Sequence, residues 1–100
     1  MPRPRKCRKI CCDPEADYFK PRGVPFRGLE EVKLEMDELE AVRLADLNML
    51  YQEKAAGKMG ISRQTFGNLI KSAHRKIADA LLNSKALRIE KSGTGGGGRR

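Results

Sequence analysis

Apolar side chains recur at helical spacing over three stretches of the chain. The stretches cover residues 37–47, residues 51–59 and, over a much longer span, residues 63–83. Positions three and four residues apart share one face of an α-helix, so each stretch predicts an amphipathic helix with one buried and one polar face. The pattern therefore predicts a mainly α domain built around three helices.

The first of these helices begins among acidic residues. Asp37 is the predicted N-cap, and Glu40, three residues later, is its capping-box partner. Glu38 and Glu40 are explained by this position, because carboxylates interact favourably with the dipole at a helix start. The predicted apolar face of this helix consists of Leu39, Val42, Leu44, Ala45 and Leu47.

Two short strands flank the helices. Val32–Leu34 alternates between apolar and polar residues ahead of the first helix, and Ala86–Ile89 follows the last one. A two-stranded ribbon is marginal in isolation. If the two strands pair, the ribbon would need support from the helices or from a second subunit.

Composition divides the 100-residue chain, which is long enough for one small domain, into three parts. Residues 1–28 hold all five prolines together with Gly23 and Gly28, which predicts an irregular or extended arm. Residues 29–91 form the predicted domain. Residues 92–100, SGTGGGGRR, are of low complexity and are expected to be a flexible tail.

The second and third predicted helices are separated by a short turn, Gly60-Ile61-Ser62. The glycine can adopt a positive φ at little cost, and Ser62 is a good N-cap for the helix that follows. The small pair Ala55-Ala56 lies where a second helix would cross closely. Any αα-hairpin could share these features. The polar outer face of the third helix favours a DNA-binding helix-turn-helix.

That outer face carries residue types suited to DNA. Gln64, Asn68, Lys71 and Arg75 share one stripe, because they follow each other at intervals of four, three and four residues. Amide side chains can pair with adenine, and arginine with guanine or phosphate. The stripe could also be an ordinary solvated face, and Gly67 within the helix either permits close approach of DNA or has no role. The candidate DNA-binding residues are Arg63, Gln64, Thr65, Asn68, Lys71 and Arg75.

The net charge of +8 is unevenly distributed. Residues 1–28 carry a net +5, residues 29–50 a net −5, and residues 51–100 a net +8. Basic charge thus coincides with the arm and with the predicted DNA-reading half, which favours a polyanionic partner such as double-stranded DNA. The sequence shows neither a membrane-spanning run nor the apolar core of a signal peptide, so we expect a cytoplasmic protein without membrane partners.

With these features in view, the chain resembles a family of small, uncharacterised proteins of bacteria and archaea that are predicted to bind DNA. The resemblance rests on the segments RPRKCRK at 3–9, YFKPRGVP at 18–25, DELEAVRLADL at 37–47, QEKAAGKMGISRQTF at 52–66 and KALRIE at 85–90. The helix-turn-helix is similar to region 4 of sigma factors, which binds promoters. The resemblance implies a three-helix, sigma-like fold of the winged-helix-like DNA-binding class, a role in transcription and no known catalytic activity.

Three clustered cysteines form the candidate metal site. Cys7, Cys11 and Cys12 have a spacing compatible with zinc, but zinc usually takes four ligands and His74 lies far along the chain. Basic neighbours in the arm are expected to favour the thiolate, which would assist metal binding and redox reactivity alike. The alternative is three ordinary reduced thiols without a cofactor.

No constellation of residues predicts an enzyme. His74, the single histidine, is expected to contact phosphate or solvent. The leading interpretation is a sequence-specific DNA-binding regulator that reads the major groove with helix 63–83. It could act as a homodimer formed through Ile77, Leu81, Leu82 and the strand at 86–89. The alternatives are a protein-interaction module that docks on RNA polymerase through the acidic helix 37–47, and a metal- or redox-responsive regulator.

Overall fold

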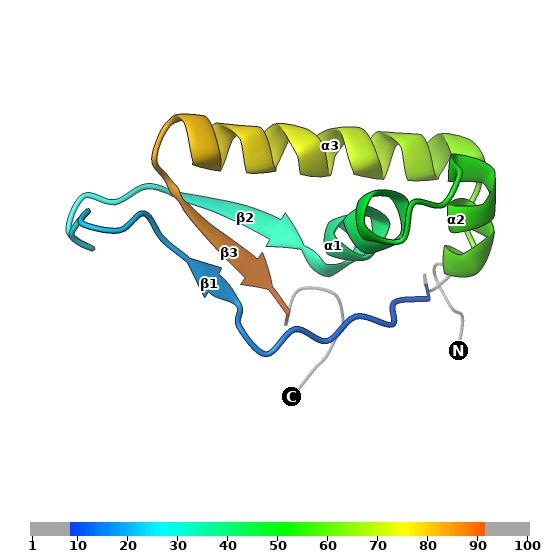
Figure 1. Cartoon of the computed structure of the whole chain (residues 1–100), viewed down its shortest axis with the longest axis horizontal. Coiled ribbons are helices and arrows are strands. Elements are labelled where there is room, and N and C mark those ends of the chain that lie inside the picture. The colour runs from blue at the N-terminus through cyan, green and yellow to red at the C-terminus, as the bar shows by residue number, and fades with distance from the viewer. Residues whose placement is uncertain (1–8, 92–100) are drawn as a thin grey trace, which may run out of the picture.

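The computed structural model describes residues 9–91, which combine helices with a small sheet (Figure 1). The elements follow in the order β1 (Tyr18–Phe19), β2 (Glu31–Glu35), α1 (Met36–Val42), the π-helical segment η1 (Arg43–Leu47), α2 (Gln52–Met59), α3 (Arg63–Leu82) and β3 (Ala86–Glu90). The predicted helices 51–59 and 63–83 are confirmed to within one residue at each end. The sheet makes the described part an α/β structure rather than the mainly α fold predicted.

The sheet has the strand order β1-β3-β2 within the described residues. β2 and β3 run parallel with Val32 opposite Leu87, so the predicted pairing of these two segments is confirmed. The prediction of a two-stranded ribbon was incomplete, because β1 from the arm pairs antiparallel with β3 and places Tyr18 opposite Arg88. The arm is therefore joined to the domain at this point by backbone hydrogen bonds.

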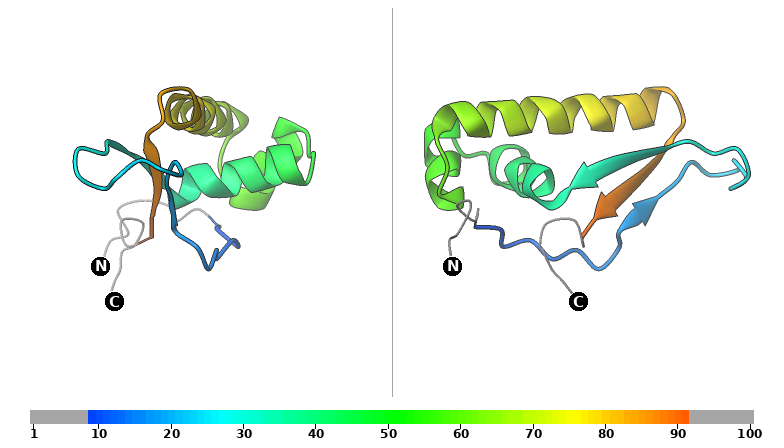
Figure 2. Two further views of the ribbon diagram at one scale, coloured as in Figure 1. Left: turned by 60° about the vertical axis from the view of Figure 1, so that its left-hand side comes forward. Right: turned by 180° about the vertical axis from the view of Figure 1, so that it is seen from behind.

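In the sequence, the helices lie between the parallel strands β2 and β3. In space, they form a layer against the sheet. α3 runs along one side of the domain, with its C-terminal half over the sheet and its N-terminal half over α1 and α2 (Figures 1 and 2). The connection from β1 to β2 projects at the end opposite α2. The first turn of α3 consequently lies at one extremity of the domain, beside α2.

The start of α1 differs from the prediction. Glu35, not Asp37, is the N-cap, and the carboxylate of Glu38 accepts a hydrogen bond from the backbone N–H of Glu35 at 2.9 Å. Both residue pairs satisfy the capping-box spacing of three residues. β2 runs directly into the helix and buries Leu34 and Met36, which places the cap two residues earlier and leaves Glu40 inside the fold.

The predicted helix 37–47 changes character at Arg43. The backbone N–H of Asn48 bonds to the carbonyl of Arg43 at 2.9 Å, five residues back, as in a π-helix. The wider turn rotates the last residues away from the predicted apolar face. Leu44 stays buried, but Leu47, which we predicted to face the core, is 75 % exposed.

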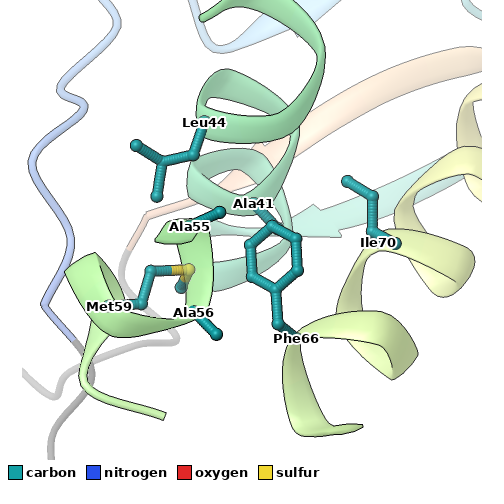
Figure 3. Close-up of a cluster of buried hydrophobic side chains, with 7 residues drawn as sticks. All are labelled: Ala41, Leu44, Ala55, Ala56, Met59, Phe66 and Ile70. Atoms are coloured by element: carbon teal, nitrogen blue, oxygen red, sulfur yellow. The ribbon is translucent and has the colours of Figure 1, made fainter. Parts of the chain in front are cut away.

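The turn between α2 and α3 is confirmed as predicted. Gly60 has a φ of +70° in the left-handed region, and the N–H of Ile61 bonds to the carbonyl of Ala56 at 3.1 Å. The Ser62 hydroxyl accepts from the Thr65 N–H at 3.0 Å and caps α3. Around this turn the core cluster consists of Ala41, Leu44, Ala55, Ala56, Met59, Phe66 and Ile70 (Figure 3).

Candidate nucleic-acid interface

α3 has one buried and one exposed face. Phe66, Ile70 and Ala73 are buried against the other helices. Successive residues of an α-helix lie about 100° apart around its axis. This spacing places the predicted stripe on the side opposite these buried residues. Its members Gln64, Asn68, Lys71 and Arg75 are all exposed, and so is Arg63, which begins the helix nearer to the buried side. We refer to these five residues as the α3 stripe.

Thr65, the sixth candidate residue, has a structural role. Its backbone N–H is capped by Ser62, and its hydroxyl accepts a second hydrogen bond from the Ser62 hydroxyl at 2.9 Å. The side chain is partly buried. Thr65 therefore helps to fix the first turn of α3, from which Arg63 and Gln64 project.

A buried carboxylate anchors the middle of α3. Glu38 in α1 is 5 % exposed and accepts hydrogen bonds from the Ser72 hydroxyl at 2.5 Å and the Lys76 ammonium at 2.8 Å. Burial alone would raise the pKa of Glu38, but the hydrogen bonds from Lys76, Ser72 and the backbone of Glu35 outweigh it, so its pKa is lowered. Glu38 thus has the capping role expected of an acid at this helix start, and it also binds α3 from a buried position, which was not predicted.

A second side-chain contact joins α3 to η1. The Nε2 atom of His74 lies 2.6 Å from a carboxylate oxygen of Asp46 in η1. His74 is exposed, in agreement with the expected contact with solvent, and it is also held by Asp46. On the same side, a Cβ atom added to Gly67 would lie 3.5 Å from the side-chain oxygen of Gln52, an ordinary contact distance. Gly67 accordingly faces α2 as well as solvent.

The arm is attached beside the α2–α3 turn. Lys9 donates its backbone N–H to the carbonyl of Met59 at 3.0 Å, and Cys12 donates its N–H to Glu40 at 3.2 Å. Glu40 is 2 % exposed and receives a two-pronged hydrogen bond from Arg43, at 2.9 and 2.7 Å. The basic segment 3–8 lies outside the described residues, and it directly precedes this attachment point in the chain.

Comparison with known proteins places the chain in a family. Residues 1–96 match the family described as "Protein of unknown function DUF134". The chain belongs to this family. The resemblance drawn from the sequence is confirmed to that extent, and no solved structure matches the chain.

Other members of the DUF134 family are close in sequence. A UPF0251 protein of Vibrio vulnificus (strain CMCP6) is 54 % identical over 89 residues, which cover 89 % of each chain. A UPF0251 protein of Desulfosudis oleivorans is 54 % identical over 90 residues, and one of Prosthecochloris aestuarii is 52 % identical over 88 residues. The aligned segment spans 65 % and 57 % of the length of these last two relatives.

The predicted thiol site of this DUF134 protein is described only in part, because Cys7 lies outside residues 9–91. Burial raises the pKa of Cys12 to about 11, and the hydrogen bond to Glu40 and the negative charge of Glu40 act in the same direction. The expectation that basic neighbours favour its thiolate was therefore wrong for Cys12. Within residues 9–91, no three His, Cys, Asp or Glu side chains are grouped closely enough to hold a metal ion.

The membrane prediction can be compared with the helices of the described part. None of these helices is both long enough and apolar enough to cross a membrane.

Proposed function

We propose that this DUF134 protein is a sequence-specific DNA-binding protein, a transcriptional regulator that reads the major groove with α3 through a sigma-like helix-turn-helix. The observation that carries the proposal is the α3 stripe, which is exposed and, apart from Arg63 at the helix start, lies on the side of α3 opposite the buried Phe66 and Ile70. Its amide and cationic side chains match the donors and acceptors of base edges and phosphates.

The dimensions of α3 suit a groove. A 20-residue helix is about 30 Å long, and the major groove of B-DNA, about 12 Å wide, admits an α-helix. The stripe extends from the first turn of α3, where recognition helices usually meet base edges, to Arg75 in its middle. Arg63 and Gln64 are therefore the proposed base readers, and Lys71 and Arg75 the proposed phosphate contacts.

Two acids of the acidic segment are turned into the fold. The two buried carboxylates of α1 are each paired with a cation, Glu38 with Lys76 and Glu40 with Arg43. Because these carboxylates are buried and paired inside the fold, they offer little charge to an external partner. This observation weighs against the alternative in which helix 37–47 docks on RNA polymerase through its acids.

DNA binding is tested by titrating a duplex selected from a random pool at several salt concentrations. We expect log affinity to fall linearly with log salt, since each phosphate contact releases counterions and contributes a slope of about −0.9. The double substitution Lys71→Gln/Arg75→Gln should reduce the magnitude of the slope by nearly 2 on the same basis. Arg22→Gln/Arg27→Gln removes the same charge from the exposed β1–β2 connection and should leave the slope almost unchanged. A folded parent protein that binds no duplex at low salt would refute the proposal.

We further propose that the protein binds DNA as a homodimer. Leu81 and Leu82 at the C-terminal end of α3 are 76 % and 82 % exposed, and Leu81 borders an apolar pocket shared with Phe19 and Leu87. Paired half-sites about 34 Å apart are the usual means by which one small reading helix gains affinity. Sedimentation equilibrium at micromolar concentration should give a dimer for the parent and a monomer for Leu82→Lys. A monomeric parent that protects a single half-site would contradict this.

A further inference from the structure

The loop between η1 and α2 exposes apolar side chains. Leu47, Met49 and Tyr51 are 75 %, 78 % and 86 % exposed, whereas Leu50 packs against the core cluster. Three large apolar side chains within five residues form a concentrated exposed patch, which is typical of an interaction site. We call Leu47, Met49 and Tyr51 the apolar loop triad.

Two backbone hydrogen bonds join the loop to η1. The N–H of Asn48 bonds to the carbonyl of Arg43 at 2.9 Å, and that of Leu50 bonds to the carbonyl of Leu44 at 3.0 Å. Met49 has a φ of 60°, in the left-handed region of backbone conformation that residues other than glycine and asparagine rarely adopt. Such a conformation persists only where its surroundings determine it, and strained residues concentrate at functional sites.

Contacts at both ends place the loop along the side of the α3 stripe. Asp46, directly before the loop, contacts His74, the neighbour of Arg75. Gln52, directly after it, lies beside Gly67, the neighbour of Asn68. The loop that carries the triad therefore runs along the flank of α3, beside the turns that carry the central part of the stripe.

We propose that the apolar loop triad is a second DNA-contact surface, which packs against deoxyribose rings and thymine methyl groups of the duplex held by α3. This inference rests on the proposed DNA-binding function. Sugars and base methyl groups are the apolar parts of a duplex, and apolar side chains contact them where a protein lies close to the groove. The triad carries no cation, so its contribution does not involve phosphate neutralisation.

The triad is tested with the variant Leu47→Ser/Met49→Asn/Tyr51→Ser. All three positions are exposed, Asn tolerates the left-handed conformation at 49, and Ser is a good N-cap at 51, so the fold is expected to persist. DNA affinity should fall by roughly tenfold through lost apolar burial, while the slope against salt stays at the parental value. Phe26→Ser, which removes an exposed ring from the β1–β2 connection, serves as the control and should bind like the parent.

A direct readout uses the two tyrosines of the chain. Labelling with 3-fluorotyrosine gives two ¹⁹F resonances, which Tyr18→Phe assigns. Addition of duplex DNA should shift the Tyr51 resonance and leave that of Tyr18 in place. This inference alone would be overturned if the parent binds DNA without a shift of the Tyr51 resonance and the triple variant binds DNA with the same affinity. A Tyr51 shift driven by protein concentration without DNA would assign the triad to a second copy and overturn it too, whereas a parent that binds no DNA at low salt would overturn both proposals.

Discussion

Replacing Glu38 with Ala is expected to lower the free energy of unfolding by about 2–4 kcal/mol, because breaking a buried ion pair leaves its remaining partners without an acceptor. The Ser72 hydroxyl and the backbone N–H of Glu35 would lose their bonds to Glu38, as would the partly exposed ammonium of Lys76. Urea unfolding followed by circular dichroism measures the loss. Glu53→Ala, at an exposed position of α2, is the charge-matched control and should stay within about 0.5 kcal/mol of the parent. Equal stability of the two variants would show that Glu38 does not anchor α3.

The same carboxylate should make stability depend on pH. The folded-state pKa of Glu38 lies below its ordinary value of 4.5, so the stabilisation is fully present above the unfolded-state pKa and is lost as pH falls through the folded-state pKa. Glu40 acts in the same direction, since its pKa is also lowered. Unfolding curves between neutral pH and pH 3 should therefore show a shallower loss of stability for Glu38→Gln than for the parent. A parallel loss in both proteins would mean that other groups control acid unfolding.

Features fixed by neighbouring residues could be predicted from the sequence. The left-handed turn at Gly60, the cap at Ser62 and the burial of Phe66 depend on local backbone preferences and on helical spacing. For that reason the helices on either side of this turn, and the exposure of the α3 stripe, agree with the expectation.

The roles of Glu38 and Glu40 could not be predicted in this way. The partners of Glu38 in α3, Ser72 and Lys76, lie 34 and 38 residues away, and the cysteine that donates to Glu40 lies 28 residues away. Acids at a helix start have a sufficient local explanation, and only the folded arrangement reveals that these two point inward. The exposed Leu47 has a similar origin, because the π-helical turn that rotates it outward has no clear local signal.

Strand β1 illustrates a different limit of prediction from the sequence. Tyr18–Phe19 is too short to be recognised from alternation, and its pairing with Arg88 and Leu87 joins segments about 70 residues apart. The aromatic character of the segment was the available signal in the sequence. The structure adds that the arm is bound at two further points, through Lys9 and Cys12.

α3 connects these observations with the proposed function. Its inner face forms much of the core, Glu38 and Asp46 hold its flanks, and its outer face is left to the stripe. A helix fixed from three sides presents its outer side chains with little freedom, which lowers the ordering cost of binding. Substitutions in the stripe should consequently alter DNA binding with little effect on folding.

Replacing Arg63 or Gln64 with Ala is expected to relax the preference at one or two base pairs, with a loss of about 1–3 kcal/mol of discrimination for each bidentate contact. Both side chains are exposed at the first turn of α3, so thermal unfolding should remain close to that of the parent. Selection of duplexes from a random pool, followed by affinity measurements on single-base variants at one salt concentration, gives the discrimination at each position. Lys71→Ala and Arg75→Ala provide the contrast, because the loss of a phosphate contact weakens all sequences alike and reduces the salt slope. If Arg63→Ala and Gln64→Ala also weaken every sequence equally, these residues position the protein on DNA and sequence is read elsewhere.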